Sequence, residues 1–313
     1  MKTALGIAAG FGLDRVFGDP QRHHPVAWFG TYALWLERHL YRKGSRAAGA
    51  AYVAACVLPP TALAVALQRR FPLATTAAAT WAALGGTSLE RTGLAMARDL
   101  ERGDVEAARA WVPWLCSRDS HLLDAAGMAR AAVESIAENT SDAAIAPLVW
   151  GALGGAPAVV AHRAINTLDA MVGYKSERYL EFGWAAARLD DAVAWIPARL
   201  TAAVHVALAG GARRADAIRA WKTQAFAHPS PNAGPVEATA AGALGVRLGG
   251  TTVYSYGVEH RPELGFGEPP RPADIARAVR LARRTQVLTA GAAVLLRSGL
   301  LAAVRAFGRS GRF

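Results

Sequence analysis

The 313-residue chain has only two cysteines and four lysines. Cys56 lies in an apolar run and Cys116 in a polar one, so neither a disulfide framework nor a cysteine metal site is expected. The short motifs of P-loop nucleotide binding, dinucleotide binding, serine hydrolases, zinc proteases and C-x-x-C redox proteins are also absent from the sequence. Common enzyme motifs therefore do not indicate the activity.

Positive charge is in excess. The chain has 35 Lys and Arg against 24 Asp and Glu, which gives a net charge of +11. No Lys/Arg block is interleaved with aromatic residues, and no zinc-finger or RNA-binding signature is present, so nucleic acid is not expected as a partner. Nearly all of the cations are arginines, which suit phosphate and carboxylate ligands. Many of them are equally explained by basic loops beside a membrane.

Hydrophobic residues make up 52% of the chain, and the mean hydropathy of +0.16 fits apolar helices mixed with polar loops. Abundant alanine favours helix. We predict an all-α, polytopic integral membrane protein, a single membrane-embedded domain over residues 1–313 with about five (four to six) apolar helices and helical polar loops. The apolar segments are about 1–18 (an uncleaved first helix), 47–67, 71–89, 143–161, 192–210 and 285–306.

Three features interrupt these apolar segments. Pro59 and Pro60 predict a kink or break in segment 47–67. Gly154, Gly155 and Pro157 allow segment 143–161 either to span or to dip in and return. Arg199 and Arg297 would cost about 2.5–3.5 kcal/mol each at mid-bilayer, so each should face a protein or water interior. Arg199 is either a phosphate ligand, or it snorkels toward the interface or forms a structural ion pair.

The polar segments expected to carry activity are 90–142, 162–191 and 211–284, and a further polar segment is 19–46. Segment 19–46 has five Lys/Arg against two acids, which favours the cytoplasmic side. Residues 260–272 are rich in Gly and Pro and predict a loop. Asp274 then predicts the N-cap of a helix over 275–285.

Glu134, Glu138 and Asp142 follow one another at helical i, i+4 and i+8 spacing. One helix face would carry all three, followed at once by an apolar segment. Three carboxylates in a row suit a bound cation such as Mg²⁺ or an amine. A plain solvated helix face has the same spacing.

Three other polar clusters have both functional and structural interpretations. Asn166, Asp169 and Lys175 supply an amide, a carboxylate and an ammonium group for a ligand. The alternative is that they belong to an ordinary amphipathic helix that stops at a glycine. Arg188, Asp190 and Asp191 precede an apolar helix and fit interface anchors as well as ligands. The HPSPNAGPVEA loop contains His228, Ser230 and Asn232 and precedes a helix. It could bind a phosphate group at the helix N-terminus or be a turn without a ligand. Asp19, Arg22, His23 and His24 gather after the first helix but make a weak metal site.

Four stretches of the chain resemble, in the same order, the CobD/CbiB family of cobalamin-pathway membrane proteins. They are LDRVFGDPQRHHPVAWFG, SRDSHLLDAAGMARAAVESIAENTSDAAIAPLVWGALGGAP, RAINTLDAMVGYKSERYLEFGWAAARLDD and HPSPNAGPVEATAAGALGVRLGG, and they cover residues 13 to about 250. One departure is GPVEA, where the family pattern often reads GWPEA.

This resemblance implies an ATP-dependent ligase. The propionate of adenosylcobyric acid would be joined to the amine of (R)-1-amino-2-propanol O-phosphate, or of threonine phosphate, to give adenosylcobinamide phosphate. The resemblance also implies Mg²⁺, a multi-pass location in the bacterial inner membrane with active-site loops in the cytoplasm, and contacts with other cobalamin-pathway membrane enzymes. Without a P-loop, ATP is expected from the resemblance alone.

On this basis each cluster receives a role. Glu134, Glu138 and Asp142 would hold Mg²⁺ or take the amine proton, and Lys175 and Arg188 would neutralise phosphate. Ser230 and Asn232 would cradle the aminopropanol phosphate. The remaining expected substrate-binding residues are Asn139, Asn166, Asp169, Asp191 and His228.

Two other classes of protein fit parts of the sequence. A transporter of a corrinoid or small metabolite would explain the interrupted apolar segments and their arginines. A non-catalytic membrane assembly partner would need fewer polar clusters than this chain has.

Overall fold

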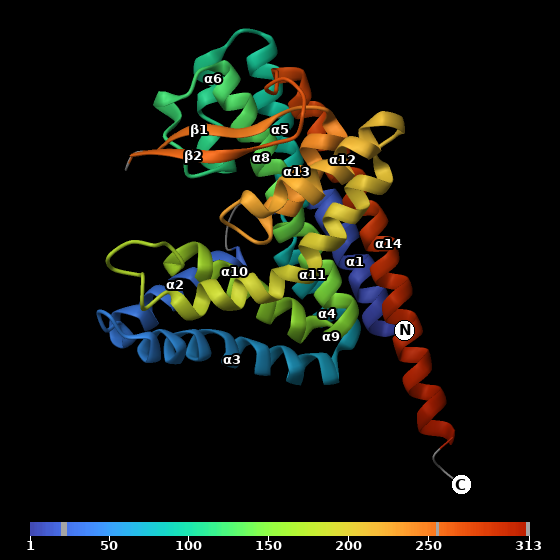
Figure 1. Cartoon of the computed structure of the whole chain (residues 1–313). Helices are drawn as coiled ribbons and strands as arrows, with labels where there is room; N and C mark the ends of the chain where they lie inside the picture. The colour runs from blue at the N-terminus through green and yellow to red at the C-terminus, as the bar shows by residue number, and fades with distance from the viewer. Residues whose placement is uncertain (20–23, 255–256, 311–313) are drawn as a thin grey trace. The chain divides into compact units, whose positions relative to one another are not determined.

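The computed structural model describes residues 1–19, 24–254 and 257–310, with the backbone alone at 252–254, 257–259 and 304–310. The described chain is almost wholly helical and has one two-stranded sheet, which confirms the all-α expectation (Figure 1). It divides into two compact units. Unit 1 comprises 1–85, 146–193 and 288–313, and unit 2 comprises 86–145 and 194–287. Helices α11 (Trp184–Leu208) and α14 (Pro272–Ser310) each contribute residues to both units. The single membrane-embedded domain stays a prediction.

Unit 1 is a helical assembly. Besides the first part of α11 and the last part of α14, it contains α1 (Lys2–Phe17), α2 (Pro25–Leu40), α3 (Arg46–Arg70), α4 (Pro72–Ala83), α9 (Ala146–Gly154) and α10 (Ala156–Val172). Helix α10 packs against α3, α9 and α4, and α1 packs along α4. Tyr52 and Phe182 fill the core between α3 and the start of α11. Gly49 packs so closely on the Phe182 carbonyl that a Cβ would overlap it.

Unit 2 combines helices with the sheet. It contains α5 (Gly86–Glu101), α6 (Val105–Arg109), α7 (Val112–Leu115), η1 (Ser120–Leu122), α8 (Ala125–Thr140), the π-helix η2 (Ser141–Ile145), α12 (Gly211–Thr223), η3 (Ala225–Ala227), α13 (Ala233–Leu244), β1 (Leu248–Tyr254) and β2 (Gly257–Leu264). Helix α8 is central, because α5, α6, α7 and α13 all pack on it. Most of its side chains are buried, Met128 and Ile136 almost completely.

The antiparallel hairpin of β1 and β2 corrects part of the predicted loop over 260–272. Residues 260–264 pair with β1, and only 265–271 leave regular structure. Helix α14 begins at Pro272, two residues before the predicted cap. Asp274 nevertheless accepts a hydrogen bond from the Arg271 N–H (2.9 Å), which closes the first turn of this helix.

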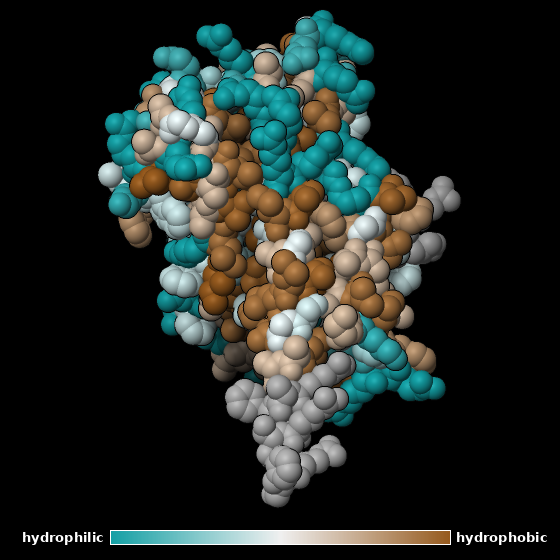
Figure 2. Space-filling model, turned by 90° about the vertical axis from the view of Figure 1, so that its right-hand side faces the viewer, coloured by the Kyte–Doolittle hydropathy of each residue, from teal (hydrophilic) through white to brown (hydrophobic). Residues whose placement is uncertain are grey.

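Two helices of the described chain are long and apolar enough to cross a membrane. They are α3 over Arg46–Arg70 and the Pro272–Ala303 part of α14. Large hydrophobic side chains of both are exposed, Leu58 and Leu63 on α3 and Leu295 on α14 among them. Figure 2 shows hydrophobic residues over a broad area of one face of the molecule. Exposed apolar surface of this extent marks membrane or protein contact.

The other expected apolar segments differ from simple spans. Segment 71–89 is interrupted after Ala83, so α4 has 12 residues, fewer than a spanning helix needs. Segment 143–161 is divided at Gly155, where φ is +71° and α9 gives way to α10. Pro59 and Pro60 do not break α3. About five spans therefore stay a prediction.

Candidate active site

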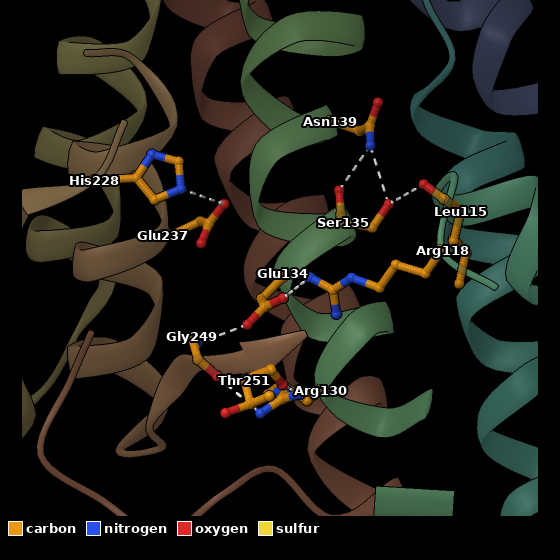
Figure 3. Close-up of polar contacts among 10 residues, drawn as sticks. All are labelled: Leu115, Arg118, Arg130, Glu134, Ser135, Asn139, His228, Glu237, Gly249 and Thr251. Atoms are coloured by element: carbon orange, nitrogen blue, oxygen red, sulfur yellow. Dashed lines mark hydrogen bonds and ion pairs between the residues drawn. The ribbon is translucent and has the colours of Figure 1, made fainter. Parts of the chain in front are cut away.

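A polar cavity of about 150 Å³ lies inside unit 2. The side chains on it come from the segment before α8, from α8 itself, from α13 and from β2. The lining residues are Leu115, Cys116, Ser117, Arg118, Ala131, Glu134, Ser135, Glu138, Glu237 and Arg261. Three carboxylates and two guanidinium groups thus share one small space in a largely apolar chain. Figure 3 shows several of these side chains pointing toward one another.

Glu134 lies deep in this group and uses both carboxylate oxygens. One accepts an ion-paired hydrogen bond from Arg118, and both side chains are about 95% buried. The other oxygen accepts from the Gly249 N–H on β1 (2.7 Å). A buried charge is tolerated only when paired and hydrogen-bonded in this way. Glu134 therefore ties α8 to the hairpin.

Glu138 and Glu237 are in a different electrostatic situation. Burial raises the pKa of Glu138, and Glu134 raises it further against the opposing effect of Arg261. Burial, with Glu134 and Glu138, raises the pKa of Glu237 well above its usual value. Glu237 is only 2% exposed. Since burial and neighbouring like charges oppose ionisation, these two carboxyls favour a proton or a bound cation.

The loop before α13 brings His228 to the same carboxyls. The Ser230 N–H donates to His228 Nδ1 (3.1 Å), and His228 Nε2 lies 3.8 Å from Glu237 Oε1. Burial lowers the pKa of His228, which favours the neutral ring. Figure 3 shows the imidazole and the Glu237 carboxyl facing each other.

Two predicted phosphate ligands of this loop have protein partners. Ser230 Oγ accepts from the N–H groups of Asn232 (3.3 Å) and Ala233 (3.1 Å), so it caps α13 itself. Asn232 Oδ1 accepts from Arg199 (2.8 Å), whose guanidinium also stacks on Trp195. These contacts are with an amide and an aromatic ring, so the phosphate and ion-pair interpretations of Arg199 both stay predictions.

Asn139 reinforces α8 beside the cavity. Its Nδ2 donates to the carbonyl and the hydroxyl of Ser135, at 3.0 and 3.1 Å, and Ser135 donates to the Leu115 carbonyl. The predicted substrate-binding amide is therefore held next to the polar wall.

Asp142 departs from the expected helix face. The α-helix ends at Thr140, and residues 141–145 form a π-helix, whose wider i→i+5 turn breaks the i, i+4, i+8 register. Asp142 is not among the cavity-lining residues. Within the described residues, no three His, Cys, Asp or Glu side chains are grouped to hold a metal ion. The structure therefore does not assemble Glu134, Glu138 and Asp142 as a ligand set, and Mg²⁺ stays a prediction.

The other predicted site residues form a second polar group, which belongs to unit 1. Asn166 on α10 donates to Asp190 on α11 (3.3 Å), and Arg188 lies 3.8 Å from Asp191. Burial raises the pKa of Asp191, against the lowering effects of Arg188 and Lys175. Lys175 itself is exposed.

The segment after Asp169 has clear structural contacts. Gly173 has φ −73°, so it is not a left-handed helix stop, and a Cβ there would lie only 2.7 Å from the Asp169 backbone carbonyl oxygen. Arg178 and Tyr179 both donate to the buried Glu37. Part of the KSERY stretch therefore anchors the α10–α11 connection to α2.

Arg118, Glu237 and Arg261 were missed by sequence reasoning. Arg118 and Glu237 lie inside stretches that carried the family resemblance, but no local spacing links them to Glu134. Arg261 lies in a stretch read as loop. Arg22 and His23 of the predicted cluster after the first helix lie outside the described residues, and His24 caps α2 through Nδ1 and the Val26 N–H.

Comparison with known proteins decides the family. The model of the CobD/CbiB protein family matches residues 7–282. The chain belongs to the CobD/CbiB family. It is similar to the cobalamin biosynthesis protein CobD of Mycobacterium tuberculosis, at 56% identity over 93% of this chain and 94% of that protein.

More distant relatives in the CobD/CbiB family carry the same description. The cobalamin biosynthesis protein CobD of Chromobacterium violaceum is 44% identical over 95% of this chain and 98% of its own length. That of Rhodobacter capsulatus is 40% identical over 91% and 94%. No solved structure matches the chain. The matched region includes the whole polar cavity, and the predicted family is confirmed together with a role in cobalamin biosynthesis.

Proposed function

We propose that this chain joins adenosylcobyric acid to (R)-1-amino-2-propanol O-phosphate, or to threonine phosphate, in an ATP-dependent reaction that forms adenosylcobinamide phosphate. The supporting observation is the buried polar cavity of unit 2, which lies wholly inside the region matched by the CobD/CbiB model. Beyond the structural Arg118–Glu134 pair, the cavity brings together Glu138, Glu237 and Arg261, which supports a binding or catalytic role over a plain scaffold. The names of the relatives point to biosynthesis as well.

The chemistry has two bond changes. The propionate oxygen attacks the terminal phosphorus of ATP, ADP leaves, and an acyl phosphate results. The amine nitrogen then attacks the acyl carbon, inorganic phosphate leaves, and the amine gives up its proton. A carboxyl whose pKa is raised toward neutrality suits the last step, because it can accept a proton at working pH. Glu138 lines the cavity, and burial raises its pKa above the usual value, which supports it as the acceptor of this proton.

Cations have two sources in this proposal. Arg261 faces the cavity and suits a phosphate oxygen. Mg²⁺ would enter with ATP, held by the nucleotide phosphates and by water, since this ion keeps several waters and takes few protein ligands. Lys175 and Arg188 of unit 1 remain proposed phosphate-neutralising residues.

We propose that the protein is a multi-pass protein of the bacterial cell membrane with its polar segments in the cytoplasm, where ATP is available. Helices α3 and α14 support membrane insertion, and the basic balance of 19–46 supports this orientation. Labelling of Lys175 from each side of sealed vesicles tests it. Labelling from the periplasmic side alone would reverse the orientation.

The test of function is a ligation assay with the purified full-length protein in detergent. It contains adenosylcobyric acid, aminopropanol phosphate, ATP and Mg²⁺, and the product is followed by mass. Product is expected from wild type and from Glu106→Gln, whose side chain is 81% exposed, and at least tenfold less from Glu138→Gln. Product from all three would keep the function and discard Glu138.

Absence of product from folded wild-type protein would contradict the proposed ligation. Uptake of a corrinoid into vesicles without ATP turnover would then favour a transporter. A folded protein with neither activity would favour a membrane assembly partner of other cobalamin-pathway enzymes.

A further inference from the structure

Helix α2 has two apolar faces rather than one. Its inner face packs on α3, where Ala33 is completely buried and the Tyr32 hydroxyl donates to the Ala55 carbonyl (2.9 Å). Its outer face exposes Leu34 and Trp35, whose side chains are 49% and 55% exposed. A helix that is apolar on more than one face needs a second apolar environment besides the core. The outer face of α2 therefore needs a partner outside unit 1.

The C-terminal end of α2 carries positive charge that is not balanced. Three acids at this end are already held in ion pairs, Glu37 by Arg178, Glu177 by Lys43 and Glu181 by Arg46. Arg38 and Arg42 are exposed, and no acid of the described residues pairs with either of them. Arg38 lies three residues after Trp35, so the two side chains share one face of the helix.

The order of these residues matches the order of polarity across one leaflet of a bilayer. Helix α3 is long and apolar enough to cross a membrane and begins at Arg46, five residues after α2 (Figure 1). Counted from the Tyr32–Ala55 hydrogen bond at 1.5 Å per residue, Arg46 lies about 14 Å and Arg38 about 9 Å toward this end of the helix pair. Trp35 lies about 5 Å deeper than Arg38 on the same scale. Cations thus mark the headgroup level, and a tryptophan lies just below them.

A lipid surface fits this face by its chemistry. Tryptophan is enriched where headgroups meet the hydrocarbon, and arginine side chains reach outward from that level to phosphate. A guanidinium group matches phosphate oxygens in geometry as well as in charge. Helix α3 beside it also exposes Leu58 and Leu63, so the apolar surface of α2 is continuous with that of a candidate membrane span. A lipid with an anionic phosphate headgroup supplies both the apolar chains and the negative charge.

We propose that Trp35, Arg38 and Arg42 form a binding surface for an anionic phospholipid, with α2 lying along α3 within one leaflet. Arg38 and Arg42 contact the headgroup phosphate, and Trp35 and Leu34 contact the upper part of the acyl chains. The proposal rests on the proposed membrane location, but it adds a lipid class and a lipid-contacting helix that is itself too short to span. It does not depend on the ligation chemistry.

The test uses the full-length protein in nanodiscs made of phosphatidylcholine alone or of phosphatidylcholine with an equal amount of phosphatidylglycerol. Wild type should melt at a higher temperature in the mixed discs. After release from them it should retain phosphatidylglycerol on the order of tenfold more than phosphatidylcholine in native mass spectrometry, as expected for two arginines at an anionic surface. Arg38→Gln/Arg42→Gln should lose at least half of the melting shift and most of the preferential retention.

A matched control removes the same charge elsewhere. Arg98 and Arg102 are also exposed and four residues apart, at the end of α5, which is not a candidate span. Arg98→Gln/Arg102→Gln should keep the melting shift and the retention of wild type. Inorganic phosphate added to discs of phosphatidylcholine alone should not raise the melting temperature, because free phosphate brings no acyl chain to Trp35.

Trp35 reports lipid contact directly through its fluorescence. Lipids brominated near the headgroup end of their acyl chains should quench wild type more than Trp35→Phe, and lipids brominated near the chain end should show a smaller difference. Thermal melting in detergent checks that each variant is folded. Ligation in detergent should be unchanged in Arg38→Gln/Arg42→Gln, since neither arginine lines the polar cavity.

Four results would overturn the proposal. Arg38→Gln/Arg42→Gln could keep the full preference for phosphatidylglycerol, the control could lose as much of it, or inorganic phosphate could reproduce the melting shift. Equal quenching of wild type and Trp35→Phe would place this face against protein instead of lipid. Ligation by wild type without any preference for phosphatidylglycerol would refute this surface and keep the proposed function. The preference without any ligation would keep this surface and refute the ligation.

Discussion

Replacing Arg118 with methionine removes one half of a buried ion pair. Arg118 and Glu134 are 5% and 4% exposed, and the Glu134 carboxylate also holds the Gly249 N–H of β1. Removing one partner of such a pair leaves an uncompensated buried charge, which costs about 3–5 kcal/mol. We expect Arg118→Met to lower the free energy of unfolding by that amount.

An exposed ion pair, formed by a lysine and a glutamate, provides the control. Lys43 and Glu177 lie 2.7 Å apart but are 72% and 86% exposed. Exposed pairs contribute at most about 1 kcal/mol, because solvent screens them and ordering long side chains costs entropy. Lys43→Met should therefore have little effect, although its ion pair is also direct.

The assay is chemical denaturation at fixed detergent concentration, followed by far-UV circular dichroism. The double variant Arg118→Met/Glu134→Gln removes both charges and should recover on the order of 1–3 kcal/mol relative to the sum of the two single effects. An Arg118→Met protein within about 1 kcal/mol of wild type, or strictly additive single effects, would refute the claim that this pair is buried and coupled.

Three further predictions follow from individual positions. Glu237→Gln should become progressively more stable relative to wild type as pH rises. The folded-state pKa of Glu237 lies above the ordinary 4.5. The contribution of the protonated Glu237 to stability is therefore complete below pH 4.5 and is lost as pH rises through the folded-state pKa. Melting curves from pH 4 to 8 that differ by a constant amount would contradict this. Gly49→Ala should destabilise α3 because of overlap with the Phe182 carbonyl, whereas Gly12→Ala, with open space around it, should gain up to about 1 kcal/mol from helix propensity; equal effects in denaturation would contradict the packing. Ser45→Ala should cost about 1 kcal/mol, because Ser45 Oγ caps α3 through the Ala48 N–H (3.2 Å), and Ser45→Asp should restore it.

Helix content was predictable because alanine has the highest intrinsic helix propensity and is abundant in this chain. Helix α8 runs over the stretch DAAGMARAAVESIAEN as expected and continues to Thr140. Its end was only partly predictable. No local residue pattern signals the switch to a π-helix at Ser141, and this switch removes Asp142 from the expected face.

Span lengths were less predictable than helix content. Hydropathy alone read 71–89 as one apolar segment, although α4 ends at Ala83 and α5 starts at Gly86. The hairpin was missed for a related reason. Gly and Pro in residues 260–272 predict irregular structure, but the first residues of this stretch pair with β1, for example Arg261 with Gly250, and strand formation depends on that partner strand.

Three of the five charged residues that line the polar cavity are not linked by any local sequence motif. Glu134 and Glu138 are four residues apart and were found from their spacing. Arg118, Glu237 and Arg261 come from three other elements, so only the tertiary fold brings them to the same cavity. Glu134 links several of these segments, because its carboxylate accepts hydrogen bonds from Arg118, before α8, and from the Gly249 N–H of β1.

The contacts also separate two roles that the sequence assigned together. Glu134 has both oxygens committed to Arg118 and Gly249, so a substitution there should act first on stability and on the position of the hairpin. Glu138 and Glu237 line the cavity and have raised pKa values, so substitutions there remove the cost of ionising a buried carboxyl and should act first on ligand binding. If replacing a carboxylate stabilises the fold and also abolishes binding, that carboxylate belongs to a functional site. A purely structural residue would not be expected to lower the stability of the fold. Opposite signs of the stability change for Glu134→Gln and Glu237→Gln at pH 8 therefore distinguish the scaffold of this cavity from its working surface.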